Sequence, residues 1–159
     1  MSDSKYGKYV VKKPVQAGKF GPELMYYGEE DYKSDFTLMF LHISEPVLME
    51  EFPHSHDFDM YLSFMGSGDM SSLDAEIEIG LGEEREIHTI TTPTSVYIPK
   101  GMIHCPLHFK RVGKPLLFVH ASIAPKYTRS NCPMTSLSNT RCRNTAQERT
   151  MRLEGKEEK

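Results

Sequence analysis

Residues 75–81 read AEIEIGL, and this short stretch predicts the class of fold. Its four apolar residues occupy every second position, and glutamate or glycine fills the positions between them. Successive side chains of a β-strand point to opposite faces, so the alternation gives this segment one buried and one wet face. A strand of this kind is typical of an antiparallel sheet that is covered on one side. The segment therefore predicts antiparallel β structure.

Similar β-like runs flank this segment on both sides. Together they make eight candidate strands, at residues 36–43, 47–56, 58–65, 75–81, 84–92, 95–99, 105–112 and 116–124. The breaks between them are rich in glycine and proline, the residues that favour turns. The region lacks both the 3.6-residue apolar period of a helix and the strand–helix alternation of a doubly wound sheet. Many short strands with close turns predict an all-β sandwich or barrel.

The chain has 159 residues, which is the length of one domain. We expect the β-barrel to occupy residues 36–124. Residues 1–35 mix Lys, Gly and Pro with apolar pairs, and we interpret them as an N-terminal arm that packs on the barrel or on a neighbouring subunit. Apolar residues become rare in residues 125–159, which we interpret as a flexible basic tail with one short helix beginning at Asn144.

The charge balance argues against a nucleic-acid-binding protein. There are 19 basic and 22 acidic residues, so the net charge is 19 − 22 = −3. A protein that binds by neutralising phosphates needs an excess of positive charge. Residues 1–124 carry 11 − 18 = −7, whereas residues 125–159 carry 8 − 4 = +4, and we interpret this basic end as a solvated extension.

Composition and cysteine usage indicate a soluble protein of a reducing compartment. The chain is 38% hydrophobic and 26% charged, and no apolar run approaches the length needed to cross a bilayer. The first residues lack the apolar core of a secretion signal. The three cysteines are an odd number without CxxC spacing, which argues against a disulfide framework. We therefore expect a cytoplasmic protein with no membrane partner.

The stretch HSHDFD at residues 54–59 has the composition of a metal site. Residues i and i+2 of a strand point the same way, so His54 and His56 place both imidazoles on one face. Asp59 lies just beyond a short bend and would add a carboxylate to the same point. Two imidazoles and a carboxylate form a suitable ligand set for a divalent transition metal.

A second motif, PKGMIH at residues 99–104, brings another histidine. Pro99 and Gly101 predict a tight turn that delivers His104 at the start of the next strand. His104 is then the fourth ligand candidate. Its neighbour Cys105 should point away from the metal in a regular strand.

These two motifs together resemble the signatures of the cupin superfamily, whose members are small jelly-roll β-barrels. The resemblance spans about residues 36–124. In that superfamily the first motif supplies two histidines and a glutamate, with a glycine seven positions after the glutamate, and the second motif supplies one histidine. Here Asp59 stands in place of the glutamate, one residue earlier than is usual, and Gly66 follows it at the matching distance.

The resemblance implies one mononuclear metal site, built from His54, His56, Asp59 and His104 near one end of the barrel. The ion would be Fe, Mn, Ni or Zn. If the shorter aspartate does not reach the metal, the site becomes a three-histidine site. Single-domain cupins commonly pair edge to edge, so the resemblance also implies a homodimer.

Three further side chains are candidate catalytic residues. Tyr61 has the same strand parity as Asp59 and would lie beside the metal, where a phenol orients substrate or acts as a general acid. His108 has the same parity as His104 and would be a pocket base, an alternative ligand or a barrel-filling side chain. His120 lies mid-strand among apolar residues and either lines the pocket or faces outward.

Two functions fit these residues. The first is a mononuclear metal-dependent cupin enzyme that acts on a small organic acid or carbonyl compound, by chemistry of the dioxygenase, isomerase or lyase type. The alternative is a non-catalytic module that binds a small molecule, in which the metal is structural or captures the ligand. Three imidazoles with one carboxylate leave open positions on an octahedral metal, which favours the enzyme.

Overall fold

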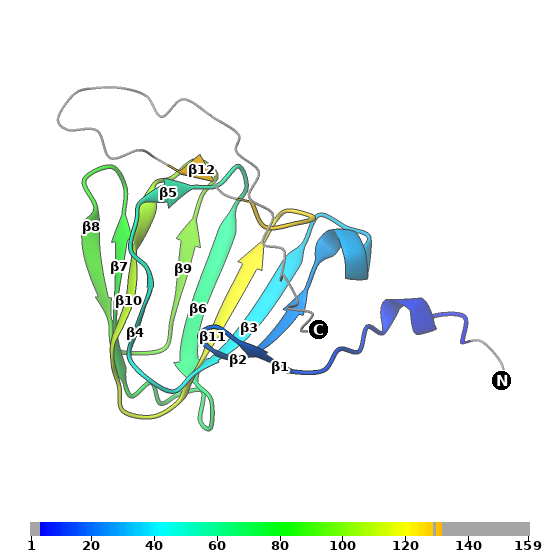
Figure 1. Cartoon of the computed structure of the whole chain (residues 1–159), viewed down its shortest axis with the longest axis horizontal. Coiled ribbons are helices and arrows are strands. Elements are labelled where there is room, and N and C mark those ends of the chain that lie inside the picture. Colours follow the sequence, from blue (N-terminus) through cyan, green and yellow to red (C-terminus); the bar gives the residue numbers. More distant parts are fainter. Residues whose placement is uncertain (1–3, 129, 132–159) are drawn as a thin grey trace, which may run out of the picture.

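Two antiparallel sheets face each other in the computed structural model, which describes residues 4–128 and 130–131 (Figure 1). The first sheet has the order β1 (Gln16–Gly18), β2 (Gly21–Tyr26), β3 (Thr37–Ile43), β11 (Leu116–Ser122), β6 (Met60–Gly66), β9 (Thr94–Ile98). The second has the order β12 (Ser130–Asn131), β5 (His54–Ser55), β10 (His104–Val112), β7 (Ala75–Leu81), β8 (Glu86–Ile90), and β4 (Val47–Glu50) pairs with β10. Two short helical turns, η1 (Gly7–Tyr9) and η2 (Gly28–Tyr32), precede β3.

Each of the eight segments expected to be β contains a strand, and the all-β prediction is confirmed. Strands that are far apart in sequence are neighbours: β11 lies between β3 and β6, and β10 pairs with β4, β5 and β7. The chain therefore crosses repeatedly between the sheets, as in a jelly roll. The described strands form two separate sheets rather than one closed barrel.

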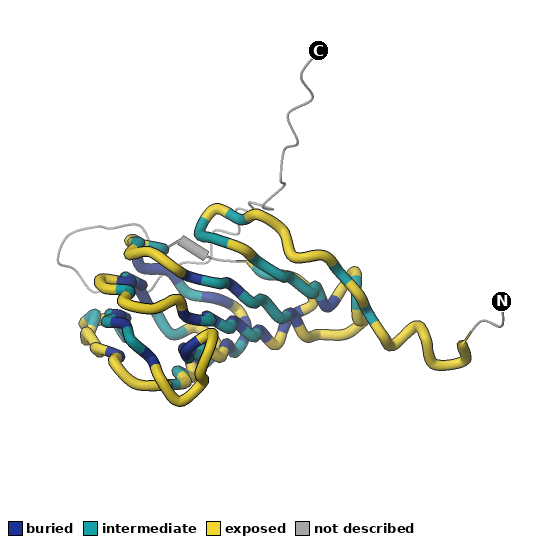
Figure 2. The backbone as a smooth tube through the Cα atoms, turned by 90° about the horizontal axis from the view of Figure 1, so that it is seen from below, coloured by how far each residue is buried: buried dark blue, intermediate teal, exposed yellow. Residues whose placement is uncertain are grey.

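The hydrophobic core fills the space between the two sheets. β7 alternates as its sequence predicts, because Ala75, Ile77 and Ile79 are fully buried while the glutamates between them are half-buried. Phe64 of β6 packs against Phe109 of β10, with ring centroids 6.0 Å apart. Figure 2 shows that the buried residues follow the strands of both sheets. This core fixes the separation of the two sheets and so the position of side chains at their ends.

Residues before β3 also contribute to the first sheet. β1 and β2 extend it beyond β3, with Met25 opposite Met39. The Lys13 ammonium donates to the Asp31 carboxylate at 2.6 Å, and the Tyr27 backbone N–H donates to the same group at 2.7 Å. Burial alone raises the pKa of Asp31, but these hydrogen bonds outweigh it and leave the pKa below its usual value. β1 and β2 were not predicted, because the sequence of this region is rich in residues that favour turns.

The chain leaves β11 and crosses one end of the jelly roll. Ala124 O accepts a hydrogen bond from the Thr37 hydroxyl at 2.8 Å, and Pro125 O accepts one from the Glu29 N–H at 2.7 Å. β12 then pairs with β5, at the top of the view in Figure 1. The helix expected from Asn144 lies outside the described residues.

Within the described part of the chain, no helix is long and apolar enough to span a bilayer.

Candidate metal centre

Three buried histidines meet at the end of the jelly roll where β5 and β10 pair. His54 lies on β5 directly opposite His104 on β10, and His56 follows β5 by one residue. The ring centroids are 4.5 Å apart for His54 and His104, 4.9 Å for His54 and His56, and 5.1 Å for His56 and His104. The sequence predicted these three as ligands, and the fold brings them together.

The turn before β10 joins the two histidine motifs. Met102 N–H donates to Pro99 O at 3.0 Å, and Gly101 has a φ of 82°, a conformation that L side chains rarely adopt. Gly101 N–H also donates to His56 O at 2.8 Å. The predicted turn is therefore present, and it ties the loop that carries His104 to the backbone of His56.

Each of the three imidazoles is held through Nδ1. The Nδ1–H of His54 donates to Phe52 O at 3.0 Å, and that of His104 donates to Met102 O at 3.0 Å. The Nδ1–H of His56 donates to Thr128 O at 2.5 Å. A carbonyl oxygen only accepts, so Nδ1 carries the proton and Nε2 of a neutral ring presents a lone pair. Histidines that bind metals are held in this way, so each of the three rings is oriented as a metal ligand would be. The donor atoms that already lie within 4.8 Å of one another are those of His54, His104 and Cys105, and His56 is not among them.

Burial keeps two of these imidazoles neutral. It lowers the pKa of His56 to about 3 and the pKa of His104 to about 4, because the charged form loses its hydration. Both rings are therefore uncharged near pH 7. Histidine binds a metal in its neutral form, so neither ring has to lose a ring proton first at that pH.

Cys105 joins this cluster, which differs from the expectation that it would point away. Its sulfur and one nitrogen each of His54 and His104 all lie within 4.8 Å of one another. The expectation assumed a regular strand, but Cys105 has a φ of 94° and the register between β10 and β7 shifts after His104. This irregularity turns the buried thiol toward the histidines.

The structure places Asp59 on the outer face of the first sheet. Its carboxylate accepts the Lys100 N–H at 2.8 Å and neighbours the Tyr97 hydroxyl. The next residue, Met60, is the one that points inward and is 1% exposed. Tyr61 has the same parity as Asp59, as expected, but it is 42% exposed and stacks on Tyr97 with ring centroids 5.1 Å apart. Neither side chain lies with the histidines.

His108 also lies away from the cluster. Leu107 and Phe109 on either side of it are buried, whereas His108 is half-buried and faces the other way. The expected common parity with His104 assumed an unbroken strand. The register shifts of β10 between His104 and His108 change which residues point inward.

His120 and Tyr127 complete the site from the first sheet's side. His120, on β11, is 6% exposed, and its Nε2 has no hydrogen-bond partner among the described residues. Burial lowers its pKa to about 4, with a further contribution from His104. The Tyr127 ring lies 5.1 Å from His120 and 4.7 Å from His56 between centroids, and its hydroxyl is 3.0 Å from Nε2 of His56.

Comparison of the fold with solved structures gives one consistent answer. The polyketide cyclase RemF from Streptomyces resistomycificus matches with a TM-score of 0.51 at 14% identity, over 80% of each chain. An oxalate oxidase matches with a TM-score of 0.55 at 12% identity, over 81% of this chain and 66% of that one. Bacillus subtilis oxalate decarboxylase matches at 0.52 and 13%, over 77% of this chain and 30% of the decarboxylase. These are cupin-fold proteins. This chain has the cupin fold.

No family model and no curated protein sequence matches the chain. The match to the cupin fold at 10–14% identity therefore concerns architecture, and the site has to be interpreted from its own residues. In this cupin fold the inward position at the start of β6 holds Met60, where the superfamily's first motif usually supplies a glutamate. The buried donors gathered within the fold are imidazoles and one thiol.

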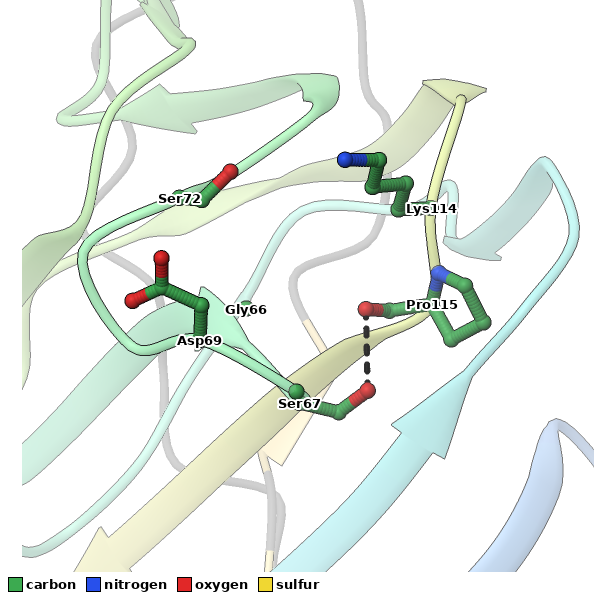
Figure 3. A pocket seen from close by; sticks show the side chains of 7 residues that line it. Gly66, Ser67, Asp69, Ser72, Lys114 and Pro115 are labelled. Atoms are coloured by element: carbon green, nitrogen blue, oxygen red, sulfur yellow. Dashed lines mark hydrogen bonds between the residues drawn. The ribbon is translucent and has the colours of Figure 1, made fainter.

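The opposite end of the cupin fold has a different character. A hollow of about 360 Å³ lies there between the turn after β6 and the turn before β11 (Figure 3). The Ser67 hydroxyl donates to Pro115 O at 3.0 Å across it, and Asp69 accepts hydrogen bonds from the Ser71 N–H and hydroxyl. The Ser67 contact joins the two turns, and the Asp69 contacts hold the first turn in its shape.

Proposed function

We propose that the protein is a mononuclear metal-dependent enzyme that acts on a small organic acid or carbonyl compound. The observation that carries this proposal is the meeting of three buried histidines, whose ring centroids lie 4.5 to 5.1 Å apart and whose Nδ1 atoms each bind a backbone carbonyl. Conversion of substrate is what separates the enzyme from a binding module with the same site.

His54, His56 and His104 would hold the ion, which is Fe, Mn, Ni or Zn. Cys105 is close enough to His54 and His104 to add a thiolate, a ligand that favours zinc or iron over manganese. Asp59 has no place in this ligand set, because its carboxylate is engaged on the outer face with Lys100. The bound metal would polarise a carboxylate, enolate or carbonyl oxygen of the substrate as a Lewis acid.

The walls of the site favour a small substrate with an apolar portion. Phe58 stacks on His56 with ring centroids 5.0 Å apart, and the Tyr127 ring packs against both, at 5.9 Å from Phe58. These rings exclude water from one side of His56. The oxalate oxidase and oxalate decarboxylase that share the fold are named for a small dicarboxylic acid, which supports a small organic acid as substrate, whereas the apolar portion is proposed from the rings alone.

His120 is the residue that we propose to move a proton. Its ring is buried beside Tyr127. Among the described residues, Nε2 of His120 is the one buried side-chain nitrogen or oxygen atom that has no hydrogen-bond partner. Because the ring is neutral at pH 7, it is able to accept a proton from a substrate held at the histidines. This proposal gives Tyr61 and His108 no catalytic role.

The test is turnover by the metal-loaded full chain. Protein loaded in turn with Fe(II), Mn(II), Ni(II) and Zn(II) is incubated with a panel of small hydroxy, keto and dicarboxylic acids, with and without oxygen, and products are followed by mass spectrometry. We expect product with one metal, and none with His104→Ala. Saturable ligand binding without product for any metal would contradict the enzyme and favour the binding module.

A further inference from the structure

The hydroxyl of Tyr127 is hydrogen-bonded to Nε2 of His56, the atom whose lone pair a metal would need. Thr128 O accepts the Nδ1–H of His56, so Nε2 of that ring is an acceptor. The Tyr127 hydroxyl, 3.0 Å away, must then donate its proton to Nε2. Two consecutive residues, Tyr127 and Thr128, therefore bind both nitrogens of one histidine. A metal that binds Nε2 has to replace the phenol proton.

Replacing that proton with a metal requires the phenol oxygen to move by about 1 to 2 Å. Metal–nitrogen and metal–oxygen bonds of about 2.0 to 2.2 Å place two ligand atoms about 3 Å apart at a right angle and about 4 Å apart on opposite sides. The observed separation of 3.0 Å already lies at the short end of this range. Because the hydroxyl lies on the lone pair of Nε2, the oxygen would have to shift by about 1 Å along that direction, or about 2 Å to the side, to reach bonding distance from an ion placed there.

The protein also restrains Tyr127 from leaving. Pro125 O, two residues earlier, accepts the Glu29 N–H, and Thr128 O, one residue later, accepts the His56 Nδ1–H. The ring itself lies within 5.9 Å of the Phe58, His56 and His120 rings, measured between centroids. Moving the phenol out of the site would break these contacts, whereas binding the metal preserves them.

Charge gives a third reason. Three neutral imidazoles leave a divalent ion with its full charge in a buried site, which is costly without an anionic partner. Asp59 is engaged on the outer face, and the Cys105 thiol beside His54 and His104 would supply one negative charge as a thiolate. A phenolate at Tyr127 would offset part of this charge.

From these contacts we infer that Tyr127 is an additional metal ligand, an inference that rests on the proposed metal site. When the metal binds Nε2 of His56, the phenol proton passes to solvent and the phenolate oxygen joins the ion. No redox change is involved. The coordination shell would then combine His54 on β5, His56 directly after it, His104 on β10 and Tyr127 after β11.

The experiment loads the full chain with Fe(III) or Cu(II), because a phenolate bound to either ion produces a charge-transfer band in the visible spectrum. Thiolate also produces such bands, so Cys105→Ser is compared in parallel to remove the contribution of the thiol. Tyr127→Phe is the test variant, and Tyr9→Phe, which changes a tyrosine exposed in η1, is the matched control. Metal content is measured on every sample.

We expect one equivalent of metal and a visible band in the wild type, Tyr9→Phe and Cys105→Ser. Tyr127→Phe should lose the band and bind the metal roughly tenfold to a hundredfold more weakly. Resonance Raman spectra of the wild type, excited in the band, should show tyrosinate ring modes, which keeps the test valid if Tyr127→Phe folds poorly. Bound metal without a Tyr127-dependent band would overturn this inference and leave the metal site standing. Absence of metal binding would overturn both.

Discussion

The hydroxyl of Tyr127 lies 3.0 Å from Nε2 of His56, although 71 positions separate the two residues in the chain. Together with the hydrogen bond from His56 to Thr128, this contact fastens the segment after β11 to the loop after β5. The two sheets are thereby linked at the end that holds the three histidines. Some substitutions at this end should therefore change metal binding and others the stability of the fold, depending on which contact each substitution removes.

Asp59→Ala should retain the metal. The carboxylate accepts a hydrogen bond from Lys100 on the outer face, so its loss should lower the free energy of unfolding by up to about 1 kcal/mol and leave the histidines unchanged. Metal content by elemental analysis and urea unfolding check the two parts. Asp59→Asn keeps an acceptor oxygen and serves as the control. A folded Asp59→Ala protein without metal would restore the aspartate as a ligand.

His120→Leu should stabilise the metal-free protein or leave its stability unchanged. The buried Nε2 has no partner among the described residues, and an unsatisfied buried polar atom costs about 1 to 3 kcal/mol. Leucine has a similar size and removes that cost, although it also removes the contact between Nδ1 and the Ser122 hydroxyl at 3.3 Å. Thermal unfolding measures the change. A loss of more than about 2 kcal/mol would mean that Nε2 has a partner in solution.

The metal-free protein should lose stability as the pH falls from about 6.5 toward 4. Burial lowers the pKa of His104 and of His120 to about 4, while the unfolded chain takes up these protons near pH 6.5. The unfolded state therefore binds more protons in this window, and each histidine costs up to about 1.4 kcal/mol per pH unit. Urea unfolding between pH 7 and pH 5 measures the slope.

His120→Leu provides the control for this pH dependence, because it removes one of the buried titrating groups. Its stability should fall less steeply with decreasing pH than that of the wild type. The carboxylates of the surface titrate equally in both proteins, so their effect cancels in the difference. Equal slopes for the two proteins would show that His120 is not the buried neutral group described above.

Phe64→Ala should destabilise the fold strongly. The ring is fully buried between the sheets and contacts Phe109 and Phe118, at 6.0 and 5.1 Å between centroids. Large-to-small changes of this kind cost about 3 to 5 kcal/mol, since they remove apolar burial and leave a cavity. Urea unfolding gives the value. Tyr97→Ala on the outer face is the matched control, and a similar loss in both variants would argue against this core.

Much of the fold could be predicted from the sequence because each strand carries its own signal. The alternation of apolar and polar residues over 75–81 depends only on which face of the strand is buried, and β7 has this alternation. The turn at Gly101 was predictable for the same local reason. β1 and β2 were missed because their residues resemble loop sequence, and only pairing with β3 makes them strands.

The candidate site was less predictable because it depends on irregular backbone and on distant contacts. Inward placement of His108 and outward placement of Cys105 both followed from regular alternation, which the register shifts of β10 interrupt. Tyr127 lies in a segment with few apolar residues, and nothing near it in the sequence indicates that it meets His56. A pattern along the chain does not record contacts of this kind.

The central claim is that three histidines hold one metal ion. Elemental analysis of the full chain, purified without added metal and again after reconstitution, tests it directly. We expect about one equivalent of Fe, Mn, Ni or Zn in the wild type and in the exposed control His88→Ala, and a loss of metal in folded His54→Ala, His56→Ala and His104→Ala. A wild-type protein that binds no metal after reconstitution, or folded histidine variants that retain it, would contradict the account.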